Sequence, residues 1–435
     1  MEGPARPLSA EDLSILALEN DIVAGHTCKV IMLGEGVSAE RVRALLAARI
    51  ARAPELALRL QSVDGAPCWV PVADVDLNAH VVTDGEAALD GGGLRGEVAR
   101  IFAERLDRSR PLWRIDVIPE IVGGAGALVW RIHHALADGA TAMRVANAVL
   151  WDVVDRAEPT PGPKSARRQA AGGDGEHGRT SSHKRRLGGL ATAAREAPRP
   201  WRRSPFDGPV GGERAIAFAS TALASLRRAT GEVAGATVND AVLALVAGGL
   251  RRWLEDHHGS LGTMRVKVPV SLHGDAHPGG ASEPGNRDSF FCLDLPLTSQ
   301  SPLARLAAIH GATKVRKDCH DAQHIDKLTR QLGDASPRLR RFAEKALANP
   351  RSFALNVSNV RGPAEPVHVD GVPVQAMYSI AEIRERHALR IAVVSFAGAL
   401  EFGLCADPSL LPQVERMAKG IEAEAQALTD SVVRV

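Results

Sequence analysis

The 435-residue chain is too long for one ordinary domain, and with 45% hydrophobic residues it can bury two or three cores. Its five cysteines are scattered, odd in number and free of a CxxC pair, which argues against a disulfide framework or a zinc site and favours a reduced, cytosolic protein. The net charge is only +2, and there is neither a signal-peptide pattern nor an apolar run of the ~18 residues that span a bilayer, so any membrane contact is expected to be peripheral.

Apolar spacing and turn residues predict a mixture of strands and helices in the first half. The run from Ser9 to Asp12 resembles a capping box that begins a short helix. Ser38 precedes helical spacing that continues to about Arg52. Further helices are expected near 95–106 and from Ala140 to Val154. Strands are expected near 27–33, 57–62, 68–72, 113–118 and 127–133, the last two joined by a glycine-rich turn at 123–126.

Residues 157–205 form a basic segment between the two halves. They hold eleven Lys or Arg against four Asp or Glu, a net charge of +7, and are rich in Pro, Gly and Ser without apolar periodicity. This composition predicts a linker that is at least partly mobile. Its charge is explained either by a solvated loop or by attraction to an anionic membrane or lipid-body surface, where each basic residue contributes roughly 1 kcal/mol. No recognition motif accompanies the charge, so nucleic acid is not an expected partner.

The second half, from residue 206 onward, repeats the mixture. Helices are expected near 220–230, 238–254, 302–347 with a break at Ser336-Pro337, and 410–428. Strands are expected near 264–270, 288–296, 352–358, 374–380, 389–396 and 400–404. The pattern predicts an α/β protein with two domains, 1–156 and 206–435, although no sequence repeat relates them.

Two adjacent histidines, His133 and His134, lie where the strand near 127–133 turns into the next helix, followed by Asp138 and Gly139. Neighbouring strand residues point to opposite faces, so one histidine faces a cavity and the other points into the packing. A neutral imidazole on such a turn is suited to accept a proton near pH 7. Asp138 can cap the helix, and Gly139 permits a tight backbone.

This HHxxxDG pattern resembles that of the CoA-dependent acyltransferase superfamily. Other motifs in order narrow the resemblance to the bacterial wax ester synthase / diacylglycerol acyltransferase family. They are Pro7-Leu8-Ser9 with Asp12, Pro111-Leu112-Trp113, Gly208-Pro209 with Gly211-Gly212, Asn239-Asp240, Val268-Pro269-Val270-Ser271, Gly285-Asn286, Ser358-Asn359-Val360 with Gly362-Pro363, and Phe402-Gly403-Leu404 with Asp407. The sequence departs from the family pattern at His273, where Arg is frequent, and at Arg361, where Pro is usual.

The resemblance implies two similarly folded α/β domains around a channel, with the active site at their junction. It implies an O-acyltransferase that moves a fatty acyl group from acyl-CoA to a long-chain alcohol or diacylglycerol. Such a transfer needs a base, donors to the developing oxyanion and a dry channel. The thioester is already activated, and the chain has neither a GxSxG nucleophile elbow nor a cysteine near the histidines. We therefore expect direct attack of the alcohol in a ternary complex.

The resemblance also assigns roles to single residues. His134 matches the family's general base, and His133 is expected to support it. Asp138 is interpreted as a cap or as half of an ion pair with an arginine of the second half, rather than as the acid of a triad. Asn239 and Asp240 open a helix, where they favour its N-terminus and help to shape the active-site wall. The channel lining or the oxyanion donors are expected among Asn286, Ser358 and Asn359, with ordinary loop hydrogen bonding as the alternative.

Several other functions are weighed against this one. Adjacent strand histidines diverge, which argues against a shared metal ion. The glycine pairs at 123–124 and 211–212 fit neither Walker A nor the dinucleotide fingerprint, so no cofactor is expected beyond acyl-CoA as substrate. An acyltransferase or condensation enzyme of secondary metabolism that uses a carrier-protein thioester keeps the same fold. A non-catalytic lipid-binding relative is a third reading. The expected location is the cytoplasm, with any membrane contact at the inner membrane or lipid bodies.

Overall fold

A computed structural model shows how the chain builds its two halves. It describes residues 4–85, 88–152, 204–259, 262–271, 288–298, 301–319, 321, 352–384 and 386–433. The basic segment 157–205 lies outside the described residues apart from its last two positions, and so does most of the predicted helical stretch beyond residue 321.

The first six-stranded sheet has the order β12-β13-β2-β7-β6-β5. Its neighbours are antiparallel except for the parallel pair β5 and β6. Its strands are β2 (His26–Leu33), β5 (Val81–Thr83), β6 (Trp113–Ile121), β7 (Ala125–His133), β12 (His368–Val369) and β13 (Val372–Ala381). β2 is buried almost throughout because alternate side chains enter two different cores. Val30 joins the core beneath α4 (Gly91–Ala103), and Ile31 joins the core of α2 (Ala39–Arg49) and α5 (Gly139–Val149).

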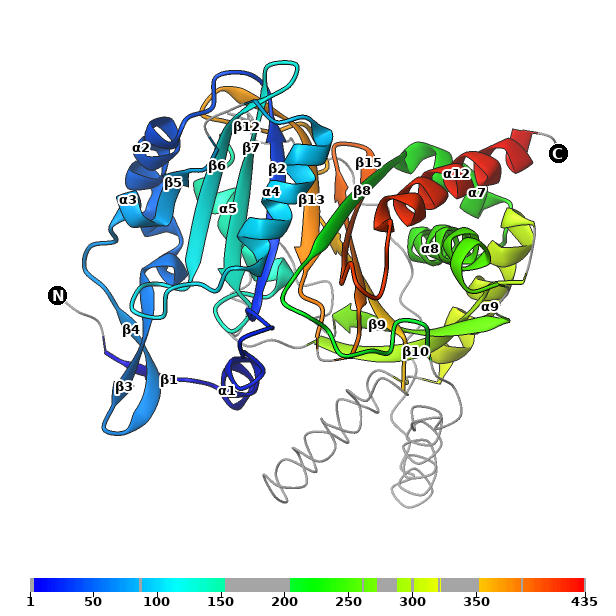
Figure 1. Cartoon of the computed structure of the whole chain (residues 1–435), viewed down its shortest axis with the longest axis horizontal. Coiled ribbons are helices and arrows are strands. Elements are labelled where there is room, and N and C mark those ends of the chain that lie inside the picture. The colour runs from blue at the N-terminus through cyan, green and yellow to red at the C-terminus, as the bar shows by residue number, and fades with distance from the viewer. Residues whose placement is uncertain are drawn as a thin grey trace, which may run out of the picture.

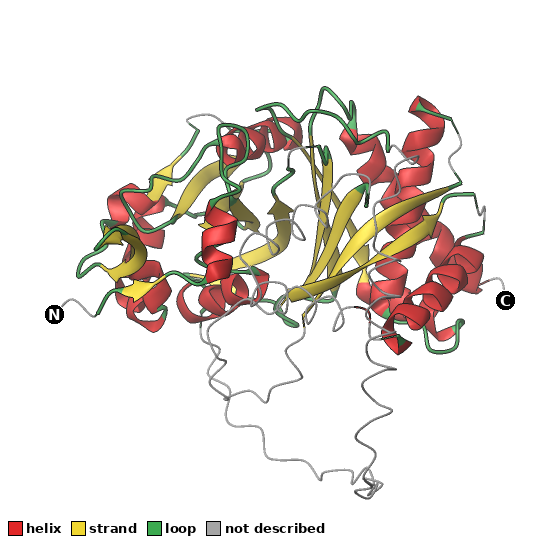
Figure 2. Cartoon of the chain, turned by 90° about the horizontal axis from the view of Figure 1, so that it is seen from below, coloured by secondary structure: helices red, strands yellow, loops and turns green. Residues whose placement is uncertain are grey.

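The second six-stranded sheet has the order β10-β9-β11-β14-β15-β8. Its strands are β8 (Ala215–Ala222), β9 (Thr263–Ser271), β10 (Asp288–Pro296), β11 (Leu355–Arg361), β14 (Leu389–Phe396) and β15 (Ala399–Ala406). Helices gather on the side of this sheet away from the first half (Figures 1 and 2). They are α7 (Leu223–Gly231), α8 (Val238–His257), α9 (Pro302–Asp318) and α12 (Val414–Val433).

Smaller elements complete the first half. A three-stranded sheet has the order β1-β4-β3 and projects beside the main sheet (Figure 1). It consists of β1 (Arg6–Pro7), β3 (Leu58–Val63) and β4 (Ala66–Pro71), and the remaining helices are α1 (Ala10–Leu16), α3 (Leu77–His80) and the 3-10 turns Ile50–Arg52 and Pro54–Ala57. No helix in the described parts of the chain is long and apolar enough to cross a membrane.

One strand from the second half of the sequence, β13, joins the sheet of the first half. This strand belongs to the second half in sequence, yet it pairs with β2 and, with β12, extends the first sheet; Figure 1 shows it in orange beside the blue β2. β13 also lies against the second sheet, where a Cβ at Gly403 of β15 would overlap the carbonyl oxygen of Ser379. The sheets therefore do not follow the predicted division into 1–156 and 206–435, because residues 368–381 cross it.

Most predicted elements are present within a few residues of their expected bounds. The capping box at Ser9 is confirmed, since its hydroxyl accepts from the backbone of Asp12 while the Asp12 carboxylate accepts from Ser9. The helix expected near 220–230 is present as Leu223–Gly231. The strand before it was not predicted: Ala215–Ala222 forms β8 along the edge of the second sheet and pairs with β15.

Candidate active site

The histidine pair lies at the junction of β7 and α5. His133 is the last residue of β7, and α5 begins at Gly139 after a short turn. The Asp138 carboxylate accepts a hydrogen bond of 2.6 Å from the backbone N–H of Thr141 and so caps α5. This confirms the predicted cap. The predicted arginine partner of Asp138 is not found among the ion pairs of the described residues.

His133 is buried in the packing, as strand alternation predicts. Its Nδ1 accepts a hydrogen bond of 3.1 Å from the backbone N–H of Ala135, so the proton of the neutral ring belongs on Nε2. Nε2 lies 3.4 Å from a carboxylate oxygen of Glu19, whose side chain is only 6% exposed. Burial acts to raise the pKa of Glu19, but His133 and Arg108, whose guanidinium lies 2.6 Å away, together hold that pKa below its usual value. Glu19 therefore faces His133 as a carboxylate.

His134 follows directly and is half-buried. Its backbone N–H donates a hydrogen bond of 3.0 Å to the carbonyl oxygen of Gly25. Burial lowers the pKa of the ring to about 4, and the positive charges of Arg384 and Arg390 act in the same direction. The imidazole is therefore neutral at pH 7, in the form that accepts a proton.

Gly25 contacts both histidines of the pair. It has φ +72°, and a Cβ built on it would lie 2.6 Å from Nε2 of His133. Both facts require glycine, because a side chain would strain the backbone and displace the ring. Sequence analysis did not single out Gly25 or Glu19. The only local signal is the position of Gly25 one residue before β2.

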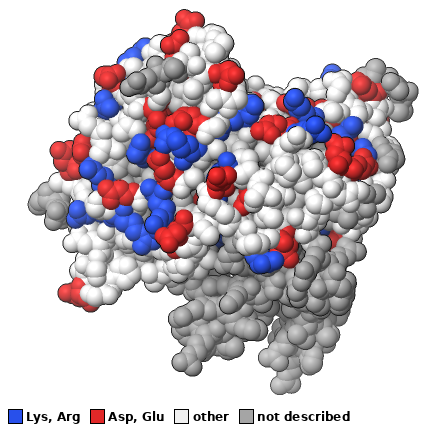
Figure 3. Space-filling model, viewed as in Figure 1, with Lys and Arg blue, Asp and Glu red and all other residues white. Residues whose placement is uncertain are grey.

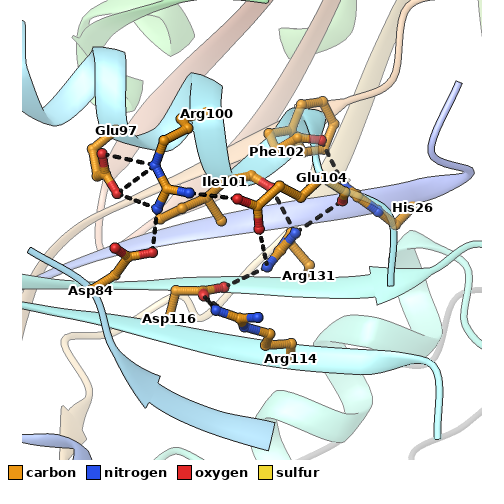
Figure 4. A network of polar contacts seen from close by, with 10 residues as sticks. All are labelled: His26, Asp84, Glu97, Arg100, Ile101, Phe102, Glu104, Arg114, Asp116 and Arg131. Atoms are coloured by element: carbon orange, nitrogen blue, oxygen red, sulfur yellow. Dashed lines mark hydrogen bonds and ion pairs between the residues drawn. The ribbon is translucent and has the colours of Figure 1, made fainter. Parts of the chain in front are cut away.

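A buried polar network beneath α4 fixes the end of β7 that carries the histidines (Figure 4). Arg131, two residues before His133, lies 3.0 Å from the Asp116 carboxylate, and both side chains are fully buried. Its guanidinium also donates to the carbonyl oxygens of Ile101 and Glu104 at the end of α4, at 2.6 and 3.0 Å.

His26, opposite His133 in the sheet, belongs to the same network and donates to the carbonyl oxygen of Phe102 at 2.9 Å. Burial and the charge of Arg131 lower the pKa of His26 to about 3, so it is neutral too. The strand end is thus held to α4 by backbone as well as side-chain partners.

The start of α5 contacts the second half. A Cβ at Gly139 would lie 3.2 Å from Val360 of β11, so the two elements are in van der Waals contact there. This brings the β11 segment with Ser358, which is half-buried, and Asn359, which is exposed, toward the turn after β7. Asn286, the third predicted channel residue, lies outside the described residues.

Asn239 and Asp240 lie in the first turn of α8, as predicted. Asp240 closes a capping box with Thr237 and is fully buried against α9, where it accepts from the Thr313 hydroxyl at 2.7 Å. Its other oxygen lies 3.1 Å from Nδ1 of His310. Burial acts to raise the pKa of Asp240, but these hydrogen bonds outweigh it and lower the pKa. The capping role is confirmed for Asp240, whereas a role of Asn239 and Asp240 in the active-site wall stays a prediction.

Comparisons with known proteins point to one family. The wax ester synthase/diacylglycerol acyltransferase catalytic domain matches residues 8–242, and the C-terminal domain of the same family matches residues 284–429. A Mycobacterium tuberculosis H37Rv protein with the provisional name diacylglycerol O-acyltransferase is 30% identical over 428 residues, 92% of each chain. A Mycobacterium bovis protein with the same provisional name is 28% identical over 460 residues, 98% of this chain and 88% of its own.

Solved structures show the same fold. A wax ester synthase/diacylglycerol acyltransferase from Marinobacter aquaeolei VT8 has a TM-score of 0.70 at 24% identity, covering 98% of this chain and all of its own. The starter condensation domain of rhizomide synthetase, in complex with C8-CoA and Leu-SNAC, has a TM-score of 0.56 at 14% identity and covers 99% of this chain and 94% of its own. At these identities the structures establish the two-domain CoA-dependent acyltransferase architecture.

Proposed function

The chain belongs to the wax ester synthase/diacylglycerol acyltransferase family, and from that membership we propose that His134 is the general base of its reaction. The activity is O-acyl transfer from acyl-CoA. The observation that carries the proposal is His134 itself: a half-buried imidazole, neutral at pH 7, on the turn between β7 and α5.

The proposed reaction proceeds by direct attack. The ring of His134 accepts the proton of the acceptor hydroxyl as its oxygen bonds to the thioester carbon. When the carbon–sulfur bond breaks, the departing CoA thiolate takes that proton, and the imidazole returns to its neutral form. The positive charges of Arg384 and Arg390 favour this return, because they disfavour the imidazolium. Bound acyl-CoA is anionic and would offset these charges, which raises the basicity of His134 in the complex.

The proposed acceptors are long-chain alcohols and diacylglycerol. The family assignment supports them over a carrier-protein substrate, since the likeness to condensation domains extends only to the fold. The test is an assay of the purified protein with palmitoyl-CoA alone, with hexadecanol, with dioleoylglycerol, and with an amino-acyl N-acetylcysteamine thioester. Free thiol and ester product are measured together. We expect acceptor-dependent thiol release matched by wax ester or triacylglycerol. Product from the amino-acyl thioester alone would overturn the lipid assignment.

We further propose that the enzyme collects its acceptor at an anionic membrane or lipid-body surface, through residues 157–205. The support is the +7 charge of this segment and the low water solubility of the acceptors. On the face drawn in Figure 3, by contrast, basic and acidic side chains of the described residues are interspersed.

Binding to anionic vesicles should then weaken as salt is raised. It should weaken further when Lys184, Arg185 and Arg186 are changed to Gln, with turnover on a short soluble alcohol unchanged. A matched control changes the exposed arginines Arg41, Arg105 and Arg110 of the folded domain to Gln. Equal vesicle binding by the wild type and the linker variant at low salt would contradict the proposal.

A further inference from the structure

The segment between α1 and β2 touches both histidines of the site. It includes Glu19 and Gly25 and enters β2 at His26. Within it, the Glu19 carboxylate faces Nε2 of His133, and the Gly25 carbonyl accepts from the N–H of His134. This segment is far from the HHxxxDG pattern in sequence, and the proposed reaction does not use it.

These contacts fix the backbone on both sides of His134. The peptide before His134 is held by its N–H, which donates to Gly25. The peptide after His134 is held by the N–H of Ala135, which donates to Nδ1 of His133. With both flanking peptide planes held, the direction of the Cα–Cβ bond of His134 is set, because the two planes share that Cα. The ring of His133 therefore supports this turn: its Nδ1 holds the backbone of Ala135, and its Nε2 faces the carboxylate of Glu19.

We propose that Glu19 is a positioning residue for His134 and acts through the ring of His133. Gly25 positions His134 from the other side, because its carbonyl oxygen accepts the hydrogen bond from the backbone N–H of His134. The inference rests on the proposed role of His134 as general base. Glu19 is not the acid of a triad, because the ring it faces is that of His133. The negative charge of Glu19 matches the proton on Nε2 and is held in turn by Arg108 at the surface.

The second half of the chain holds the same segment from its other side. Glu382, just after β13, accepts a hydrogen bond of 3.2 Å from the backbone N–H of Ala24. Arg214, just before β8, donates to the carbonyl oxygen of Ile22 at 2.5 Å and pairs with Glu382 at 3.0 Å. Both side chains of this pair are buried. The segment that positions His134 is therefore fully held only when the two halves of the chain are in contact.

The test compares Glu19→Ala with Glu19→Gln, which keeps a side-chain oxygen toward His133. We expect Glu19→Ala to lower kcat by about 10- to 100-fold with the KM for palmitoyl-CoA unchanged, as expected when a reacting group is misplaced by about 1 Å. Glu19→Gln should retain more activity. The matched control is Asp21→Ala, which removes a carboxylate of the same segment whose side chain is 96% exposed. The control should keep wild-type turnover.

A double-mutant cycle with His134→Ala separates this inference from the proposed function. If Glu19 acts through the base, Glu19→Ala should cause no further loss in the His134→Ala background. The same fractional loss in both backgrounds, or full turnover of a folded Glu19→Ala protein, would overturn the positioning role. Full turnover of His134→Ala would instead overturn the proposed function.

A measurement on the wild type does not depend on how the variants fold. Side-chain 15N spectra, with His133 assigned by comparison with His133→Gln, should show the proton of the neutral ring on Nε2. A proton on Nδ1 would be incompatible with the N–H of Ala135 as donor, and it would contradict the proposed support of the turn by the His133 ring.

Discussion

Replacing His134 with alanine is expected to lower turnover by about two to four orders of magnitude, the usual contribution of a general base. The reason is that the alcohol then attacks without a group to accept its proton, while binding of acyl-CoA is retained. The variant should remain folded, because the backbone hydrogen bond of residue 134 to Gly25 does not depend on the side chain. Turnover is measured as thiol release with ester formation. Near-normal turnover in a folded His134→Ala protein would exclude the assignment, and His133→Ala is expected to lose less.

The pH dependence of the wild type gives a second view of the same group. Only the neutral ring accepts a proton, so kcat/KM should rise as pH increases through about 4 and level off above it. The profile must be limited to pH values at which circular dichroism shows folded protein. His26 and His134 both have lowered pKa values, so the unfolded chain binds more protons than the native protein below about pH 6.5, and stability falls as the pH is lowered. A profile centred near pH 6.5 would show that the ring is not held as described.

The fold was predictable where local pattern and tertiary environment agree. The strand ending at His133 is apolar because both its faces are buried, and α5 shows its apolar spacing directly. β8 was missed because its alanine-rich sequence also suits a helix, and only its pairing with β15 decides the matter. The pairing of β13 with β2 joins residues more than three hundred positions apart. Neither strand carries a local signal of its partner.

The same division applies to the site. His134 and Asp138 lie within one short motif whose chemistry follows from residue type and spacing, so both could be named from the sequence. Glu19 is one acidic residue among many in a polar segment, and its burial against His133 arises only when α1 and β7 come together. The influence of Arg384 and Arg390 on His134 depends on how the two halves dock. Sequence reasoning therefore predicted His134 as the reacting group, but neither the carboxylate that faces its neighbour His133 nor the charges that lower its pKa.

Changing Asp116 to alanine is expected to destabilise the protein by about 3–5 kcal/mol, because the fully buried Arg131 would lose its buried carboxylate partner and keep only the more exposed Glu104 carboxylate, 3.9 Å away. Denaturant unfolding monitored by tryptophan fluorescence measures the loss. A matched control is Asp256→Ala, which breaks an exposed pair with Arg416 whose side chains are both 57% exposed. Such a surface pair is worth less than about 1 kcal/mol. A loss at Asp116 no larger than that of the control would contradict the burial argument.

The double variant Asp116→Leu with Arg131→Met tests what the pair contributes beyond charge balance. Removing both charges avoids an uncompensated buried ion, so much of the stability should return. Recovery should remain incomplete, because Arg131 also donates to the carbonyl oxygens of Ile101 and Glu104 at the end of α4. Those two bonds hold the strand end that carries His133 and His134. If stability returns while turnover stays low, Arg131 is needed for the geometry of the site. If both return fully, the hydrogen bonds from Arg131 to the end of α4 are not needed for either property.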